Sequence, residues 1–291
     1  MTARKIGFID YFLDEWHANN YPRWIREAAG GRWEAALAWA ELDAPPDRGP
    51  GATAARGTEQ WCAEHGIERA ASIGELIGRC DAIVVLSPDH PQHHERLAAE
   101  ALRSGKPVYV DKTFAPNRAA AERMFELAAE CGTPLFSSSA LRFARELEPW
   151  QAERGRAAES RAAFVLGGGG FDHYAVHSFE MLTVLMGTGA KRLKAYGGAE
   201  LFTYIVDYGD GRQGTVVQTP PAPFQASCAA ADGGTAFFAE CTDYFPRLIR
   251  EMLAFFDSGG APVEAAETIG TMALIDAARL ARQKQDEWMN L

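Results

Sequence analysis

The stretch from Ile83 to Asn117 constrains the fold more than any other part of the chain. An apolar run ends at Ser87-Pro88, amphipathic residues follow up to Ala101-Leu102, and a second apolar run ends at Lys112. This order predicts a strand, a helix and a second strand. The stretch is therefore expected to form a right-handed βαβ crossover in a parallel sheet.

Open parallel sheets bind ligands beyond the carboxyl ends of their strands, so residues at both strand ends are expected to line one crevice. These residues are Ser87, Pro88, His90, His94, Asp111 and Lys112. Lys112 is the first candidate for a catalytic residue. From its position alone, a solvated lysine at a strand end is the alternative.

The residues before about 140 alternate apolar runs with helical patterns, which is typical of an α/β domain with a doubly wound parallel sheet. Further strands are expected at 5–10, 33–42 and 133–139, and helices at 58–65, 73–80 and 117–131. The sequence predicts two domains, because 291 residues exceed most single cores. We place them at residues 1–140 and 141–291, and the closing helix is allowed to pack back on the first domain.

The second part of the chain has a different pattern. A helix is expected from Phe171 to near Gly187, and the hairpin turn Asp207–Gly211 joins two apolar runs. Consecutive hairpins predict an antiparallel sheet. Its strands are expected at 161–166, 193–196, 201–208, 213–218, 225–230 and 235–240, before closing helices at 247–256 and 265–284.

Composition excludes several classes of protein. The net charge of −10 argues against a nucleic-acid or anionic-membrane partner, because the long-range field repels phosphates. No apolar run approaches the ~20 residues of a membrane span, and no leader pattern precedes the first strand. The five scattered cysteines favour reduced thiols over a disulfide framework or zinc site. We expect a cytoplasmic protein.

The turn after the first strand lacks the glycines of a dinucleotide-binding loop. The motif G-x-G-x-x-G lets backbone N–H groups approach a pyrophosphate, but its three positions here hold Asp10, Phe12 and Glu15. Their side chains would fill the phosphate site, and the acids would repel phosphates. Either a dinucleotide binds in an altered pose, or this domain has lost it, or the segment is a polar turn that needs no ligand.

An acidic residue also ends the second predicted strand. Asp43 is in the place where a carboxylate meets a ribose hydroxyl in dinucleotide-binding sheets. A turn-forming aspartate is the alternative, because Pro45-Pro46 follows it.

Three segments together resemble one family in the right order. They are 81–88, the A-L-R-S-G-K-P-V-Y-V-D-K-T stretch at 101–113, which is similar to A-L-x-x-G-K-x-V-x-x-E-K-P, and 174–187, which is similar to an H-x-x-(D/E)-x-L-x-x-L-x-G helix. The chain is therefore identified as resembling the Gfo/Idh/MocA-type oxidoreductases, as a divergent member without the three glycines.

The resemblance implies an N-terminal Rossmann domain and a C-terminal α/β domain with an open antiparallel sheet. It further implies NAD or NADP as the cofactor and a sugar, polyol or related small molecule as the substrate. Family members often assemble through the open sheet, so a homo-oligomer, dimer or tetramer, is expected.

The resemblance also assigns residues. Lys112 matches the lysine of E-K-P, with Asp111 and Thr113 in place of its glutamate and proline. His177 matches the histidine of the helix. The family aspartate four residues before that histidine is replaced by His173, with Asp172 one residue early.

Alcohol oxidation needs a base for the hydroxyl proton. His177 suits this role because imidazole titrates near neutrality, and Lys112 would orient the oxygen. Tyr174 lies on the same helical face as His177 and is expected to share the proton path. His173 and His177 have metal-ligand spacing, but no third ligand is evident, so no metal is predicted.

Two classes of function stay open at this point. One is an NAD(P)-dependent oxidoreductase acting on a hydroxyl or carbonyl group. The other is a member that has lost the dinucleotide and serves as a sugar-binding or partner subunit. The altered acid–base pattern also leaves open nicotinamide-assisted elimination or hydrolysis, which the family includes.

Overall fold

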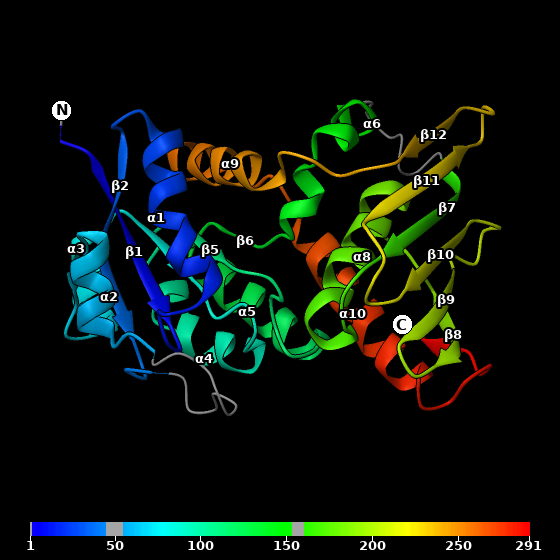
Figure 1. Cartoon of the computed structure of the whole chain (residues 1–291), viewed down its shortest axis with the longest axis horizontal. Helices are drawn as coiled ribbons and strands as arrows, with labels where there is room; N and C mark the ends of the chain where they lie inside the picture. Colours follow the sequence, from blue (N-terminus) through cyan, green and yellow to red (C-terminus); the bar gives the residue numbers. More distant parts are fainter. Residues whose placement is uncertain (1, 45–54, 153–159) are drawn as a thin grey trace. The chain divides into compact units, whose positions relative to one another are not determined.

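The structure is a computed structural model that describes residues 2–44, 55–152 and 160–291 (Figure 1). The chain divides into two compact units, each made of several segments. Unit 1 comprises Met1–Pro116, Glu122–Ser137 and Leu248–Val263, and unit 2 comprises Asn117–Ala121, Ser138–Arg247 and Glu264–Leu291. The domain boundary predicted at residue 140 stays a prediction.

Unit 1 contains a six-stranded parallel sheet in the order β3-β2-β1-β4-β5-β6. The strands are β1 (Arg4–Asp10), β2 (Trp33–Ala40), β3 (Glu68–Arg69), β4 (Ala82–Val85), β5 (Val108–Val110) and β6 (Leu135–Phe136). Strand β4 pairs with β5 in parallel, so the parallel strand pair predicted within residues 83–117 is confirmed. Its strands are fully buried, which explains their continuous apolar sequence.

The helices that accompany this sheet mostly follow the predicted pattern. They are α1 (Trp16–Ala29), α2 (Thr58–His65), α3 (Ile73–Arg79), α4 (His94–Ala98), α5 (Arg118–Glu130), which continues from unit 2 into unit 1, and α9 (Tyr244–Ser258). The crossover between β4 and β5 is a broken helix, because α4 is flanked by two 3₁₀ turns, η1 (Pro91–His93) and η2 (Ala101–Arg103).

Most of α9 belongs to unit 1, although it comes late in the chain. The ring of Phe255 meets that of Phe136 with centroids 4.8 Å apart, and the ring of Phe256 meets that of Trp33 at 5.5 Å. Asp257 accepts a hydrogen bond from the Trp33 indole at 2.9 Å. The core of unit 1 therefore depends on a segment near the end of the chain.

Unit 2 contains a seven-stranded sheet in the order β12-β11-β7-β10-β9-β8-β13. Its strands are β7 (Ser160–Gly167), β8 (Arg192–Gly198), β9 (Leu201–Asp207), β10 (Gln213–Gln218), β11 (Gln225–Ala230), β12 (Thr235–Phe238) and β13 (Met289–Asn290). The predicted antiparallel arrangement holds for every described pair except β7 and β10, which are parallel. The sheet is mixed because β10 runs parallel to β7 on one side and antiparallel to β9 on the other.

Helices α8 (Phe171–Met186) and α10 (Ala265–Ala281) pack on one face of this sheet, and α6 (Glu148–Ala152) precedes its first strand. The 3₁₀ turns η3 (Ala140–Phe143) and η4 (Arg145–Leu147) lead into α6. Alternating burial along the strands gives the sheet one covered face and one open face.

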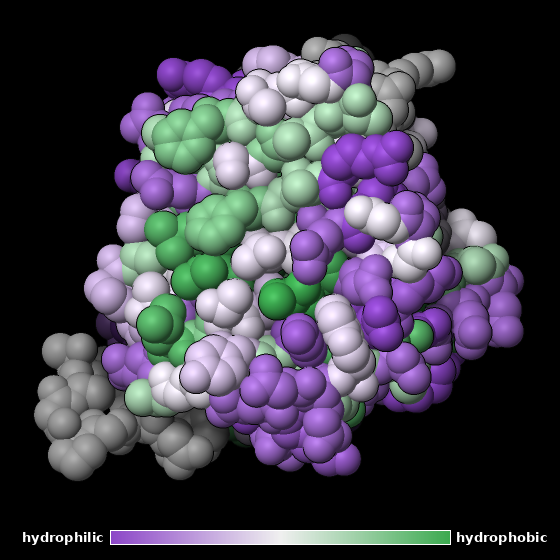
Figure 2. All heavy atoms as spheres, turned by 90° about the vertical axis from the view of Figure 1, so that its right-hand side faces the viewer, coloured by the Kyte–Doolittle hydropathy of each residue, from purple (hydrophilic) through white to green (hydrophobic). Residues whose placement is uncertain are grey.

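The open face of the unit 2 sheet carries large apolar side chains. Cross-strand pairs place Phe164 beside Thr215 and Ser227, and Ser227 beside Phe237. A neighbouring row places Tyr196 beside Thr203. Phe237 and Tyr196 are 71% and 68% exposed, and Figure 2 shows apolar side chains gathered on this side of the molecule.

None of the helices in the described ranges is long and apolar enough to cross a membrane. All five cysteines are free thiols in the structure.

Candidate functional site

The carboxyl ends of β1 and β4 meet through a direct contact between Asp10 and Ser87. The Ser87 hydroxyl donates to Asp10 Oδ1 at 2.7 Å, and the Tyr11 backbone N–H donates to the same oxygen at 2.7 Å. Both side chains are buried. The structure thus brings together two residues that the sequence analysis placed at the ligand end of the sheet.

Asp10 is held in an environment that favours its protonated form. Burial raises the pKa of Asp10 to about 8, against the opposing effect of its hydrogen bonds with Ser87 and Tyr11, and the Asp111 charge adds to the rise. Such a group carries a proton at neutral pH, so Asp10 presents a carboxylic acid where a glycine would stand in a phosphate-binding turn.

Glu15 occupies the amino end of α1. Its carboxylate accepts hydrogen bonds from the backbone N–H groups of His17, at 2.7 Å, and of Ala18. These are the donors that a helix amino end would otherwise offer to a phosphate. The chain supplies its own acceptor there, so the β1–α1 turn does not fit a pyrophosphate in the position that glycine-rich turns give it.

Lys112 follows β5 and is only 7% exposed. Its ammonium lies 3.5 Å from the Pro88 carbonyl oxygen and 3.8 Å from Asp89 Oδ1. Its backbone N–H donates to Asp111 Oδ1 at 2.8 Å. The lysine predicted to be catalytic is therefore a confined cation at the carboxyl end of the sheet, and not a solvated strand-end residue.

Aromatic rings gather beside the first turn. The Tyr11 ring lies 4.0 Å from the His93 ring and 5.5 Å from the His90 ring. Phe12 meets His90 edge-on at 5.5 Å. The predicted cofactor contacts Phe12 and His90 therefore share one aromatic cluster, with Tyr11 and His93 as members that the sequence analysis did not predict.

His94 has a different environment from the one we expected. It is fully buried, and its Nδ1 and Nε2 lie 3.0 Å from the Phe114 carbonyl oxygen and 2.6 Å from the Leu86 carbonyl oxygen. This imidazole links the end of β4 to the segment after Lys112. These contacts hold His94 in the core of unit 1, and its predicted role as a cofactor contact stays a prediction.

Asp43 is exposed after β2, and its Oδ1 accepts the Thr58 backbone N–H at 2.9 Å. It therefore caps α2, whose N-cap residue Gly57 has no side chain to do so. The predicted ribose contact of Asp43 stays a prediction.

In unit 2, His177 is oriented by a hydroxyl group. Nδ1 of His177 lies 2.6 Å from the Ser139 hydroxyl oxygen, which also accepts the Leu141 N–H at 3.2 Å. The Phe224 ring packs edge-on against the imidazole at 5.7 Å. The Ser139 contact at Nδ1 fixes the orientation of the imidazole, and the catalytic role of His177 stays a prediction.

Glu180 holds the segment that carries Ser139 through several hydrogen bonds. Its carboxylate accepts the Ser139 N–H at 2.8 Å, the Ser138 hydroxyl at 2.6 Å and the Arg142 guanidinium at 2.8 Å. Burial would lower the pKa of Arg142, but Glu180 and Glu267 hold it above its ordinary value. This buried network fixes the loop that carries Ser139.

Tyr174 and His177 lie on the same face of α8, with ring centroids 5.7 Å apart. The Tyr174 ring packs over Gly169, where an added Cβ would come within 2.1 Å of it and where φ is +77°. Glycine is therefore required at 169 for this tyrosine position. His173 and Asp172 are exposed, and no group of three metal-ligand side chains occurs among the described residues.

Lys112 belongs to unit 1 and His177 to unit 2. Their predicted pairing across one ligand stays a prediction, as do the catalytic roles of Tyr174 and His173.

Sequence reasoning missed Ser139 and His17. Ser139 ends a run of three serines that closes the strand predicted at 133–139, which is a signal for polar groups at a strand end. His17 stands at the first turn of α1, near Glu15, but the residue that it contacts is far away in the sequence.

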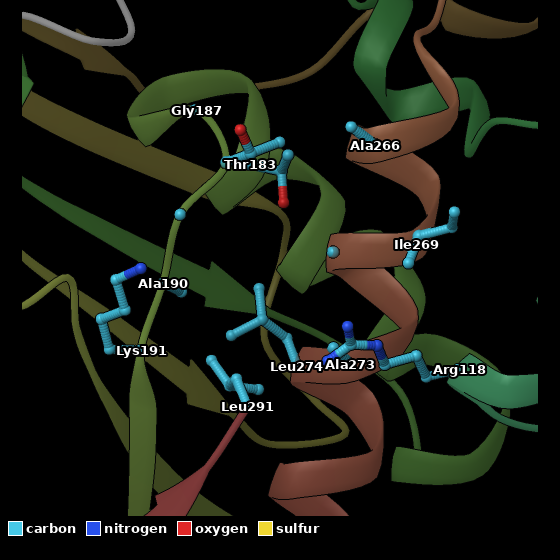
Figure 3. Close-up of a pocket in the computed structure, with 13 residues that line it drawn as sticks. Arg118, Thr183, Gly187, Ala190, Lys191, Ala266, Ile269, Ala273, Leu274 and Leu291 are labelled. Carbon is cyan, nitrogen blue, oxygen red and sulfur yellow. The ribbon is translucent and has the colours of Figure 1, made fainter. Parts of the chain in front are cut away.

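A cavity of about 410 Å³ lies within unit 2 between α10 and the 187–191 loop (Figure 3). The residues that line the cavity include Arg118 and Lys191, which come from different segments, and the apolar Leu274 and Leu291. None of the predicted site residues lines this cavity, so it does not correspond to the site that the sequence predicts.

Comparison with known proteins agrees with the residue-level resemblance. Residues 50–138 match the family model described as an oxidoreductase family with an NAD-binding Rossmann fold. The resemblance to the Gfo/Idh/MocA family is confirmed. A search of curated protein sequences gives no significant match.

Solved structures share the fold of the chain at low sequence identity. A probable dehydrogenase from Thermotoga maritima has a TM-score of 0.78 at 15% identity, covering 98% of both chains. Scyllo-inositol dehydrogenase from Lactobacillus casei, with NAD(H) and scyllo-inositol bound, has 0.79 at 12% identity, covering 99% of both chains. A myo-inositol dehydrogenase homologue from Sinorhizobium meliloti 1021 has 0.74 at 14% identity, covering 99% of both chains. The predicted Gfo/Idh/MocA two-domain α/β fold is thus confirmed.

Proposed function

We propose that this protein is an oxidoreductase acting on a hydroxyl or carbonyl group of a sugar, polyol or related small molecule, with NAD or NADP as its redox partner. The observation that carries the proposal is the position of Lys112. A buried ammonium 3.5 Å from the Pro88 carbonyl, at the carboxyl end of a parallel sheet, is suited to hold a substrate oxygen. The match to an NAD-binding oxidoreductase family supports the redox chemistry.

Each unit contributes a residue with a defined task in this proposal. Lys112 orients the reacting oxygen and stabilises negative charge that develops on it. His177 takes up or returns the hydroxyl proton at Nε2, because its Nδ1 side faces Ser139. Tyr174, on the same helical face, shares the proton path.

The substrate class is supported by the proteins that share the fold. The Lactobacillus casei and Sinorhizobium meliloti proteins are named as inositol dehydrogenases. Carboxyl, hydroxyl and imidazole groups gather at the carboxyl end of the unit 1 sheet, which suits a polyhydroxylated substrate.

A second candidate is a chain that has lost the dinucleotide and binds a sugar or a partner protein. Glu15 specifically favours this candidate, because its carboxylate occupies the helix amino end that binds pyrophosphate in glycine-rich turns. An oxidoreductase would have to hold the pyrophosphate elsewhere along the sheet.

Thermal unfolding with NAD⁺, NADH, NADP⁺ and NADPH discriminates the two candidates. The oxidoreductase proposal predicts a higher melting temperature with at least one dinucleotide, and turnover in a panel that includes scyllo-inositol, myo-inositol and hexoses. A melting temperature that none of the four changes would favour the cofactor-free candidate.

We also propose that a second copy of the chain covers the open face of the unit 2 sheet. Phe164, Phe237 and Tyr196 expose apolar surface there, and no helix of unit 2 covers that face among the described residues. The resemblance to a family that assembles through this sheet supports a homo-oligomer.

A further inference from the structure

His17 and Asp111 form a buried imidazole–carboxylate pair in unit 1. Nδ1 of His17 lies 2.5 Å from Asp111 Oδ2, and the two side chains are 10% and 1% exposed. His17 comes from the first turn of α1, and Asp111 follows β5. The pair therefore joins the amino end of a helix to the carboxyl end of a central strand, at the sheet edge where α/β proteins bind ligands.

Asp111 is held as an anion by its surroundings. Its Oδ1 accepts the Lys112 N–H at 2.8 Å and the Tyr109 hydroxyl at 3.2 Å. Burial alone would raise the pKa of Asp111, but the charge and hydrogen bond of His17 and the charge of Lys112 hold it below its ordinary value. An ionised carboxylate at Nδ1 keeps a proton on that nitrogen in both protonation states of the ring, so the ring gains and loses its second proton at Nε2.

The other titratable groups around the pair favour their neutral forms. Burial raises the pKa of Glu15 well above its ordinary value, and the Asp10 charge adds to the rise. Burial acts in the same direction on the pKa of Tyr21, whose ring lies 5.5 Å from that of His17, and on the pKa of Tyr109. Asp10 also retains its proton near neutrality.

Three acidic side chains therefore interact at one place, and their environments separate their protonation states. Such a separation marks groups with distinct acid and base tasks. Asp111 alone among the three is held ionised, and it is the one that contacts an imidazole. A purely structural ion pair would also bury Asp111 and His17, so the test has to probe the reactivity of the ring.

We propose that His17 is an acid–base residue of this site and that Asp111 is its positioning residue. In the proton transfer, a hydroxyl O–H bond of a small polar ligand breaks and an N–H bond forms at His17 Nε2. The imidazolium is then stabilised by the Asp111 carboxylate, and the proton returns by the reverse step. The identity of the ligand rests on the proposed function, whereas the state and reactivity of the ring do not.

The first experiment needs no substrate. Nitrogen-15 NMR of histidine-labelled protein should show His17 with its proton on Nδ1 at pH 7, and Asp111→Asn should shift its titration midpoint. Diethyl pyrocarbonate, followed by mass spectrometry, should acylate His17 at a rate that Asp111→Asn changes at least about threefold. His65→Gln serves as the matched control, since His65 stacks on Trp61 at 4.3 Å in α2 and has no place in the site.

A ring protonated on Nε2, or a His17 that stays unmodified while exposed histidines react, would overturn the proposal even if the protein turns over polyols. Where turnover is found, His17→Gln should lower kcat by roughly 10²- to 10⁴-fold and remove one limb of its pH profile. Retention of that limb would equally overturn the role of His17, while leaving the oxidoreductase function intact. Melting temperatures of all variants check that each is folded.

Discussion

The Ser139 hydroxyl oxygen lies 2.6 Å from Nδ1 of His177 in unit 2. The same serine receives support from Glu180 through its backbone N–H. A histidine held at one nitrogen by a fixed hydroxyl is oriented for proton exchange at the other, and this relationship sets the first prediction.

We expect Ser139→Ala to lower kcat by roughly 10- to 100-fold, because the imidazole loses the contact that fixes its orientation. Ser139→Thr, which retains the hydroxyl, serves as the control. Steady-state kinetics with a substrate from the polyol panel would measure both. Equal rates for Ser139→Ala and the unchanged protein would remove the orienting role of Ser139.

Lys112 gives a second prediction. Lys112→Met preserves most of the side-chain volume but removes the cation, so we expect kcat to fall by at least about 100-fold, since stabilisation of a developing oxyanion is lost. Lys112→Arg keeps a charge but changes its shape. A rise in KM with kcat unchanged in Lys112→Met would instead assign the lysine to substrate binding alone.

A substitution at Glu15 tests whether a dinucleotide binds at the turn between β1 and α1. Glu15→Ser keeps a capping oxygen but removes the longer side chain that occupies the helix amino end. We expect NADH to bind about 2- to 30-fold more tightly, because a negative pyrophosphate at a free helix amino end gains roughly 0.3–2 kcal/mol. Isothermal titration calorimetry measures the affinity, with Glu15→Gln as a size-matched control. An unchanged Kd would mean that the pyrophosphate does not approach this turn.

Asp10 predicts a pH dependence of stability. Its folded-state pKa of about 8 exceeds the unfolded value of 3.8, so the folded state binds more protons between these limits. Its contribution to the free energy of unfolding therefore falls as pH rises from about 4 to 8, by an amount on the order of a few kcal/mol.

Urea unfolding at several pH values, compared with Asp10→Asn, isolates this contribution. Asparagine keeps an oxygen for Ser87 and Tyr11 but does not titrate. The free energy of unfolding of Asp10→Asn should therefore rise relative to that of the unchanged protein as pH increases. A difference in the free energy of unfolding between the two proteins that is constant from pH 5 to 8 contradicts the prediction.

The open sheet face gives the last prediction. Phe164→Glu places a charge in the middle of the exposed apolar row, so we expect an oligomer to dissociate to monomers. Arg250→Glu, on the exposed side of α9, controls for a change of net charge. Light scattering coupled to size-exclusion chromatography reports the mass. If the protein without substitutions is monomeric at all concentrations tested, the proposed homo-oligomer is wrong.

The sequence predicted those features that depend on local pattern. Continuous apolar β-branched runs indicated the buried parallel strands β4 and β5, and helical spacing indicated α8 almost to its ends. Lys112 was found because its position follows directly from a strand end. These signals are contained within short stretches of chain.

Features that depend on contacts between distant residues could not be predicted in this way. Strand β10 pairs in parallel with β7. Hairpin turns predict pairing only between strands that follow one another in the chain, so they do not predict this pair. His17 has no distinguishing mark in the sequence until Asp111 is placed beside it. The burial of His94 against two backbone carbonyls likewise has no signal in the sequence.

The late position of α9 has a consequence for biosynthesis. Phe255 and Phe256 complete the packing around Phe136 and Trp33, yet the ribosome adds them after nearly all of the remaining chain. The core of unit 1 therefore stays incomplete until α9 has been synthesised, so this unit cannot finish folding in strict order from the amino terminus.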